Sequence, residues 1–563
     1  MSGPGDKTSY EIQVFQDKHW VIAEMASDEA KAKAFADNLL QTGNHEAVRV
    51  VKDYRRSDGT HTETVVVEKK ADARAAQPVQ LSPITEAPPC AELADFYRLP
   101  ARLTMGRLLR KYLDEVLVTP SELLLSAPEL KRFGDKDRLL FAAIERVAAL
   151  QAKVSGEDAK ARKDQLDKVW EEILGKARAA QAKKLATPKS VAEALKTAGS
   201  GPDAEYLLSY LLAQALLERR SWLGKIDLLI AWTAEPDADK VMERIDGVVA
   251  DIMLSAQVIQ DLLGFQSNLA HALCHLVDLS EGKAETAKFA PASFTALNEL
   301  FAKGRLPQSA KVLLTRVVRE LGGTNPLSRN EPKQEYEMFH KVVHRLISRD
   351  GLIGGPASAE AILQRGSRTY SAGNTVGALQ AMDFVISVLG EGCLTVQFMT
   401  QLVASTLGAG MPEAVTDMLA GEVRKASHID AWVPVRVSPR DRMAALTSAN
   451  AALLAAELPE ELKAELGGVV DEVLAKYLLD EEVIEKIDKP DDPLALRAIR
   501  LIKFCGSGVL IKGKSLNLAR ERVIEHLKQK QFEEKFLASV PDQAQAEKHL
   551  REFHRLLVET GFR

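Results

Sequence analysis

The sequence predicts a mainly α protein. We expect a multi-helix body, built as helical hairpins or a bundle, behind a small N-terminal α+β domain of ββαββ order. Three observations support this. Apolar residues recur every three or four positions from about residue 91 to the end, β-branched alternation is confined to the first 70 residues, and aromatic residues make up only 6% of a chain rich in Ala and Leu. Ala and Leu favour helices and let them pack closely.

The first 70 residues read as one small domain. The segments YEIQVF (10–15) and HWVIAEM (19–25) alternate in the manner of paired strands. Residues 28–42 follow as an amphipathic helix, with Ser27 and Asp28 able to cap its start and Gly43 at its expected end. Two further β-branched runs, 46–54 and 62–70, flank Asp58-Gly59, which is a strong hairpin signal.

Residues 71–91 predict a flexible Pro/Ala-rich linker, because the segment ADARAAQPVQLSPITEAPPC has four prolines and no periodicity. Beyond it we expect a helical region over 92–200, a helical core domain over 201–489 and a C-terminal helical segment over 490–563. The first of these holds a Lys-, Ala- and Glu-rich stretch, 153–196, that predicts a long exposed helix or a helical hairpin.

Composition narrows the class of protein. The formal net charge is −5, so general nucleic-acid binding is disfavoured. Four widely spaced cysteines without a C-x-x-C motif favour a reducing cytosol over a disulfide scaffold. The longest uncharged run, 392–412, holds several Gln, Thr and Ser residues and predicts a buried helix, and we expect no membrane partner.

The stretch GVLIKGKS, residues 508–515, matches the phosphate-binding pattern G-x-x-x-x-G-K-S/T. A functional loop of this kind follows a buried strand, whereas residues 493–505 have helical spacing. Val509, Leu510 and Ile511 favour burial over contact with a triphosphate, and only 48 residues follow Ser515. We therefore expect a helix–loop–helix connection and no nucleotide site.

A weaker anion-binding hypothesis remains for Lys512, Lys514 and Ser515. Residues 497–530 hold nine Lys or Arg and two Glu, beside an expected helix N-terminus. The preceding residues 480–492 hold seven acidic residues and two lysines, so internal neutralisation or a solvated basic face is the simpler interpretation.

Two His pairs with i, i+4 spacing are the other candidate site. His271, Cys274, His275 and Asp278 share one helix face, and Glu337, His340 and His344 share another. Such pairs can bind a transition metal when a second element completes the shell. The alternative is that these residues are ordinary core or half-exposed side chains. No H-E-x-x-H, G-x-S-x-G or EF-hand pattern accompanies them.

No assembled catalytic residues emerge, and we expect no cofactor other than a possible transition metal. The leading hypothesis is a non-enzymatic cytosolic scaffold or adaptor that binds other proteins, partly through the strand edges of the N-terminal domain. One alternative is a metal-binding helical sensor or enzyme that uses the His pairs. The other is an anion- or nucleic-acid-binding C-terminal segment.

Overall fold

The fold is mainly α with a small N-terminal α+β domain, as predicted. The computed structural model describes residues 7–16, 19–41, 47–55, 61–70, 80–90, 92–136, 138–286, 291–329, 332–371, 377–540 and 542–562. Asp58-Gly59 and Gly43 lie outside these residues. The chain divides into two compact units, residues 1–228 with 287–291, and residues 229–286 with 292–563.

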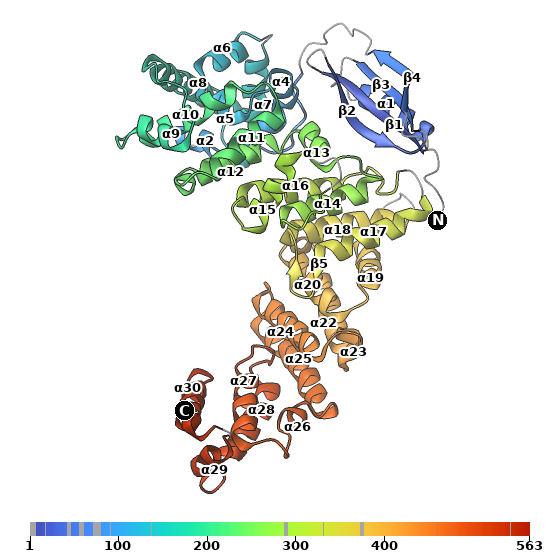
Figure 1. The fold of residues 1–563 in the computed structure, drawn as a ribbon, viewed down its shortest axis with the longest axis vertical. Helices are drawn as coiled ribbons and strands as arrows, with labels where there is room; N and C mark the ends of the chain where they lie inside the picture. The colour runs from blue at the N-terminus through green and yellow to red at the C-terminus, as the bar shows by residue number, and fades with distance from the viewer. Residues whose placement is uncertain are drawn as a thin grey trace. The chain divides into compact units, whose positions relative to one another are not determined.

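The N-terminal domain is a four-stranded antiparallel sheet with one helix (Figure 1). The elements are β1 (Lys7–Gln16), β2 (His19–Ala26), α1 (Glu29–Gln41), β3 (Ala47–Arg55) and β4 (His61–Lys70). The strand order is β2-β1-β3-β4, so β2 and β4 are the edges. Asp28 caps α1 as expected, because its carboxylate accepts a hydrogen bond of 3.0 Å from the amide of Lys31.

Alternation along the strands separates the two faces of the sheet. Side chains of Ile12, Val14 and Val50 pack with Ala32 and Ala36 of α1 into a buried core. The intervening residues of β1 and β3 point to the opposite face, since successive side chains of a strand alternate. Helix α1 therefore covers one face only.

The first unit continues with short helices that surround the hairpin of α7 and α8. Its helices are α2 (Leu93–Tyr97), α3 (Leu99–Leu108), α4 (Arg110–Val116), α5 (Pro120–Leu125), α6 (Ala127–Gly134), α7 (Leu139–Ser155), α8 (Ala159–Ala182), α9 (Val191–Ala198), α10 (Ala204–Leu217) and the first half of α11 (Trp222–Thr233), at which the chain passes into the second unit. Gly156, at a φ of 74°, ends α7 in the left-handed conformation and allows the turn into α8. Leu166 and Ile173 bury the inner side of α8, so the charged stretch forms half of a helical hairpin.

The part of the Pro/Ala-rich segment that the structure describes differs from the flexible linker we expected. Residues 80–90 lie along the helices as an extended strap, with Ile84, Ala87 and Cys90 buried. The strap belongs to no helix or sheet, so its carbonyls have no secondary-structure partner. Side chains of α7 supply donors: Arg146 Nη2 donates to the carbonyl of Ile84 and Gln151 Nε2 to that of Pro88, both at 2.6 Å. Residues 71–79 lie outside the described residues.

The second unit is a succession of stacked helices. They are η1 (Ala238–Lys240), α12 (Met242–Ile252), α13 (Ala256–Leu263), α14 (Leu269–Ser280), α15 (Ala292–Ala302), α16 (Pro307–Gly322), α17 (Pro332–Leu346), α18 (Gly355–Tyr370), α19 (Ala378–Leu389), α20 (Gly392–Val403), α21 (Thr406–Ala409), α22 (Pro412–Lys425), α23 (Ile429–Trp432), α24 (Pro439–Ala455), α25 (Glu460–Asp480), α26 (Val483–Ile487), α27 (Leu494–Cys505), α28 (Lys514–Leu527), α29 (Phe532–Ser539), η2 (Gln543–Gln545) and α30 (Ala546–Glu559).

Long helices of this unit pack on others that follow within a few elements: α14 on α16, α16 on α18, α18 on α20, α20 on α24, α24 on α25 and α25 on α28. A two-residue hairpin, β5 (Ile347–Ser348) with β6 (Gly351–Leu352), is a small departure from the all-helical body we expected. The uncharged run 392–412 forms the buried helix α20 and the short α21. None of the described helices is long and apolar enough to cross a membrane.

Candidate functional sites

The phosphate-loop pattern lies between two helices. Helix α27 ends at Cys505 and α28 begins at Lys514, so a helix and not a strand leads into the loop. Val509, Leu510 and Ile511 are buried, with exposed fractions of 5–7%. These side chains anchor the connection in the core and do not surround a phosphate position.

The N-terminus of α28 already holds a negative charge from within the chain. The carboxylate of Asp471, on α25, accepts hydrogen bonds from the amides of Lys514 (2.5 Å) and Ser515 (3.0 Å) and from the Ser515 hydroxyl (2.6 Å). This carboxylate occupies the place that a phosphate would take at a helix N-terminus. A Cβ on Gly513 would lie 2.1 Å from Asp471 Oδ2, so the glycine permits the close approach.

The remaining residues of the anion-binding hypothesis do not converge on a vacant position. The ammonium group of Lys514 bonds to Glu472, the neighbour of Asp471 on α25. Lys512 is exposed. The same capping arrangement recurs where Asp246 of α12 accepts from the amides of Gln308 (2.7 Å) and Ser309 (2.9 Å) at the start of α16. It therefore joins helices in two places and has a structural role.

The two His pairs lie on α14 and α17, which pack against each other. Three of the four imidazoles, those of His271, His275 and His344, have a hydrogen-bond partner among the described residues, while His275 Nε2 is buried without one. His271 Nδ1 lies 2.9 Å from Ser267 Oγ and 2.8 Å from Asn268 Oδ1, and His275 Nδ1 lies 3.2 Å from Gln266 Nε2. His344 Nε2 lies 3.0 Å from the carbonyl oxygen of Val388.

A cation engages the acidic residues of this face. Arg345 donates through Nε to Asp278 and through Nη2 to Glu281, both at 2.5 Å, and so holds α17 on α14. Burial lowers the pKa of His271, and the Lys341 ammonium lowers it further. Arg345 directly follows His344 in the sequence, but the sequence does not show that its side chain pairs with Asp278 on another helix.

Burial also affects the ionisation of two further candidates, Cys274 and His340. Burial raises the pKa of the Cys274 thiol to about 11. Burial also lowers the pKa of His340, whose ring centroid lies 4.2 Å from that of His344. Within the described ranges, which include all seven candidates (Glu337 among them), no group of three or more His, Cys, Asp or Glu side chains is placed to hold a metal ion.

The outer face of the N-terminal sheet presents an aromatic and cationic cluster. Cross-strand pairing places Phe15 opposite Trp20 and Gln13 opposite both Ile22 and Arg49. The Phe15 and Trp20 rings meet edge to face with centroids 5.2 Å apart, and the Arg49 guanidinium lies 4.4 Å from the Trp20 ring centroid. Arg49 Nε also donates to Gln13 Oε1 at 2.8 Å.

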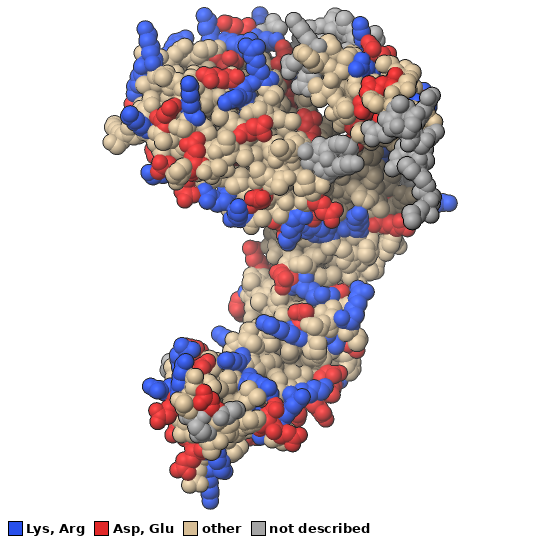
Figure 2. Space-filling model, viewed as in Figure 1, with Lys and Arg blue, Asp and Glu red and all other residues tan. Residues whose placement is uncertain are grey.

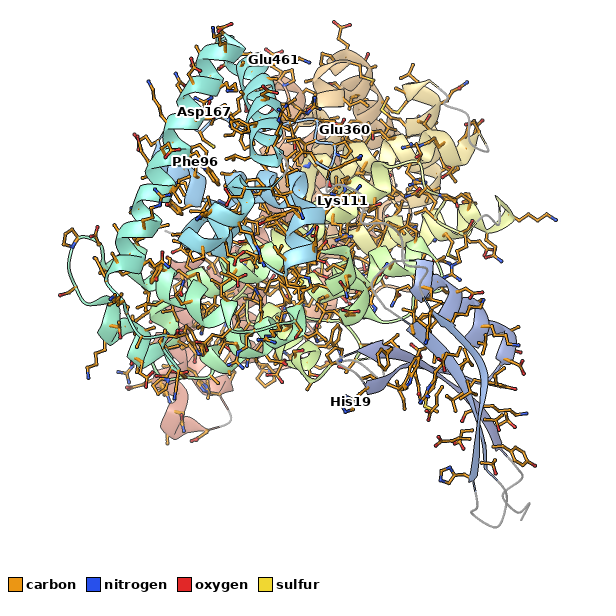
Figure 3. All side chains as sticks on the ribbon, turned by 90° about the horizontal axis from the view of Figure 1, so that it is seen from above. His19, Phe96, Lys111, Asp167, Glu360 and Glu461 are labelled. Atoms are coloured by element: carbon orange, nitrogen blue, oxygen red, sulfur yellow. The ribbon has the colours of Figure 1, made fainter. Side chains whose placement is uncertain are left out.

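This cluster lies beside an edge strand with little protection against further pairing. Figure 3 shows side chains that project from both faces of the sheet, with His19 at the start of β2. Val21 and Ile22, in the middle of β2, are each 48% exposed. The other edge, β4, carries Glu63, Glu68, Lys69 and Lys70 among its residues, whereas Glu24 is the one Asp, Glu, Lys or Arg residue of β2. Charged residues on an edge strand oppose pairing with another chain.

The fold and these sites define a class: a mainly α protein whose N-terminal sheet, among the described residues, carries its own helix on one face only and has one weakly protected edge. On the face drawn in Figure 2, positive and negative side chains are interspersed. The chain matches no protein-family model, no curated protein and no solved structure.

Proposed function

We propose that the chain is a non-enzymatic cytosolic adaptor that binds an extended segment of another protein along strand β2. The observation that carries the proposal is the exposed apolar edge of β2 next to the Trp20–Arg49 cluster. An extended peptide that adds to a sheet edge gains main-chain hydrogen bonds, and side-chain pockets beside the edge supply selectivity.

The length of strand β2 and the side chains along it indicate what kind of segment the partner presents. Strand β2 has eight residues, which is the length of segment that we expect to pair. Ile22 and the Trp20 ring point to the outer face, so alternate apolar residues of the partner contact them. An acidic residue of the partner near Arg49 adds a charge-assisted contact.

Two further features support the proposal. All four cysteines are free thiols, which fits the reducing cytosol that we propose as its location. The helical body supplies a large surface of mixed charge, suited to holding a second protein, and we propose neither a membrane nor a nucleic acid as a partner.

Site-specific photo-crosslinking tests the proposal in the native host. We expect a benzoyl-phenylalanine at Ile22 to crosslink a distinct protein, and one at Ala34, on the exposed side of α1, to give no such product. Purified partner peptide is then titrated against two matched variants, Ile22→Lys on β2 and Val65→Lys on β4, whose wild-type side chains are 48% and 49% exposed.

We expect Ile22→Lys to weaken binding at least about tenfold, because a lysine on the pairing edge opposes strand addition. Val65→Lys should bind as the wild type does. Equal crosslinking at both positions, or equal affinity of both variants, would refute edge recognition. If neither the full chain nor a chain without residues 1–70 retains any protein, the adaptor role itself is wrong.

A further inference from the structure

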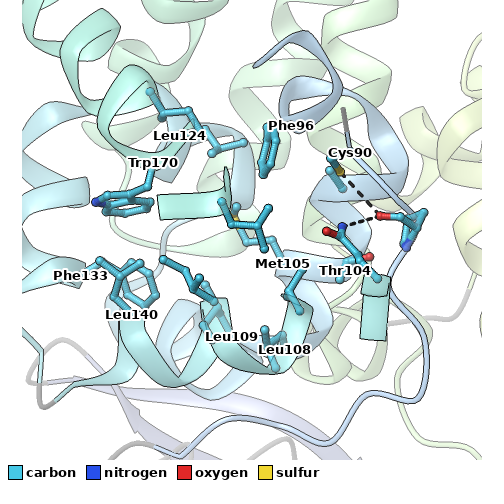
Figure 4. Close-up of a pocket in the computed structure, with 18 residues that line it drawn as sticks. Cys90, Phe96, Thr104, Met105, Leu108, Leu109, Leu124, Phe133, Leu140 and Trp170 are labelled. Atoms are coloured by element: carbon cyan, nitrogen blue, oxygen red, sulfur yellow. Dashed lines mark hydrogen bonds between the residues drawn. The ribbon is translucent and has the colours of Figure 1, made fainter. Parts of the chain in front are cut away.

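A cleft in the helical part of the first unit has no role in the proposed function. It lies between α3, α7 and α8 and has a volume of about 100 Å³ (Figure 4). Buried residues of the unit's main core, such as Leu108 and Ala143, form its floor. Phe96, Met105 and Trp170 also line it and are only half-buried, so the cleft opens to solvent.

The few polar groups of the lining are already engaged. The Thr104 hydroxyl donates to the carbonyl of Pro100 at 3.0 Å. Gln151 donates to the carbonyl of Pro88, and its own Oε1 accepts from Arg162 Nε at 2.9 Å. An occupant therefore finds almost no hydrogen-bonding partner inside the cleft, and a polar group placed there would lose its bonds to water.

Size restricts the occupant further. An engineered apolar cavity of about 150 Å³ in another protein accepts benzene and stays dry when empty. The present cleft is smaller and cannot admit the several side chains of a helix face. Its ends are also distinct: Cys90 and Thr104 lie at one end, and Trp170, Phe133 and Leu140 at the other (Figure 4).

The geometry points to a binding site for a single unbranched alkyl chain in this cleft. The chain lies between Met105 and Ala143 with its tip towards Trp170, and its polar end stays in solvent beside Thr104. The alkyl chain belongs to a free amphiphile, and a lipid in a bilayer, which offers the same hydrocarbon, is the alternative that the test separates from it.

Calorimetric titration of the full chain with n-alkanols from propanol to decanol tests the site. Each methylene buried in the cleft should raise affinity roughly fourfold, until the cleft is full and the increase stops. A branched or cyclic alcohol of equal carbon number should bind more weakly. If affinity does not grow with chain length, or if branched and linear alcohols bind equally, the inference is wrong.

Matched variants locate the binding. Ala143→Leu fills the cleft and should lower octanol affinity more than about tenfold, whereas Ala142→Leu, on the exposed side of the same helix, should leave it unchanged. Met105→Ala enlarges the cleft at its half-buried rim, so the affinity plateau should move to longer alkanols even if the Ala143 variant fails to fold. Equal affinities for the 142 and 143 variants, or an unmoved plateau in Met105→Ala, would overturn the assignment.

Flotation with phosphatidylcholine vesicles distinguishes the two sources of the alkyl chain. Flotation that Ala143→Leu abolishes supports a lipid acyl chain. Alkanol binding without flotation supports a free amphiphile. Flotation that Ala143→Leu leaves intact, in a protein whose alkanol affinity does not depend on chain length, contradicts the site.

Discussion

The buried ion pair between Glu122 and Lys225 permits a quantitative test of how the first unit is held together. Lys225 Nζ donates to Glu122 Oε1 at 2.5 Å and to the carbonyl of Leu117 at 2.6 Å. The exposed fractions of the two side chains are 1% for Lys225 and 0% for Glu122. Burial raises the pKa of Glu122 and lowers the pKa of Lys225, and each group partly offsets the shift of the other.

We predict that Lys225→Met destabilises the unit by about 3–5 kcal/mol at pH 7, because it leaves a buried carboxylate without its counter-charge. An independent route gives a similar value. If Glu122 instead takes up a proton, the cost relative to an unfolded glutamate of pKa about 4.3 is about 3.7 kcal/mol at pH 7. The Glu122 pKa in the folded variant then exceeds its unfolded value, so the deficit grows as pH rises above about 4.3 and falls to about 1 kcal/mol at pH 5.

Hydrogen exchange of the amides of α10, which packs on α5, reports opening of this unit separately from the other. The control is the double variant Glu122→Gln/Lys225→Met, which removes both charges and should recover much of the loss. A deficit below about 1 kcal/mol at pH 7, or one that is equal at pH 5 and pH 7, would refute the reasoning.

Three further predictions concern other parts of the chain. Gly513→Ala should destabilise α28 by about 2 kcal/mol, because its Cβ would collide with the Asp471 carboxylate. The control Gly421→Ala has open space around its Cβ and should not destabilise the protein. Thermal unfolding compares the two variants, and an equal loss of stability would contradict the role of Asp471 as the cap of α28. Burial raises the pKa of Asp488, but hydrogen bonds from Arg497 and His526 outweigh it and lower the pKa overall. The stability that this carboxylate contributes is therefore complete above about pH 5 and is lost as pH falls below about 4. Asp488→Asn should lower the free energy of unfolding by about 1–3 kcal/mol at pH 7 and leave it unchanged near pH 2. A loss of stability that persists at pH 2 argues against this. Burial raises the pKa of the Cys505 thiol to about 11, so iodoacetamide at pH 7.5 should label it more than about 100-fold more slowly than a free thiol, and rapid labelling would show that the thiol is not buried in this way.

Local patterns in the sequence predicted the type of the helices and of the four N-terminal strands, but not the short β5–β6 hairpin. Alternation placed the four strands, three- and four-residue spacing placed the helices, and burial of Val509, Leu510 and Ile511 was visible in their apolar character. These features depend on neighbours a few positions away, because strand and helix periodicities repeat within a few residues. The same information excluded a strand before Gly508, and the structure confirms that α27 leads into the loop.

Only the tertiary structure decided which groups meet. Asp471 and Ser515 are 44 positions apart, and Glu122 and Lys225 are 103 apart. The residues next to Asp471 in the sequence do not show that it caps α28, and the residues next to Glu122 do not show that it pairs with Lys225. The packing of whole helices sets these pairings. Once packing removes a charge or an amide from water, its partner must come from whatever segment lies beside it. The strap of residues 80–90 illustrates the same point. Its composition predicts a linker, but in the fold side chains of α7 donate hydrogen bonds to its carbonyls and hold it on the helices.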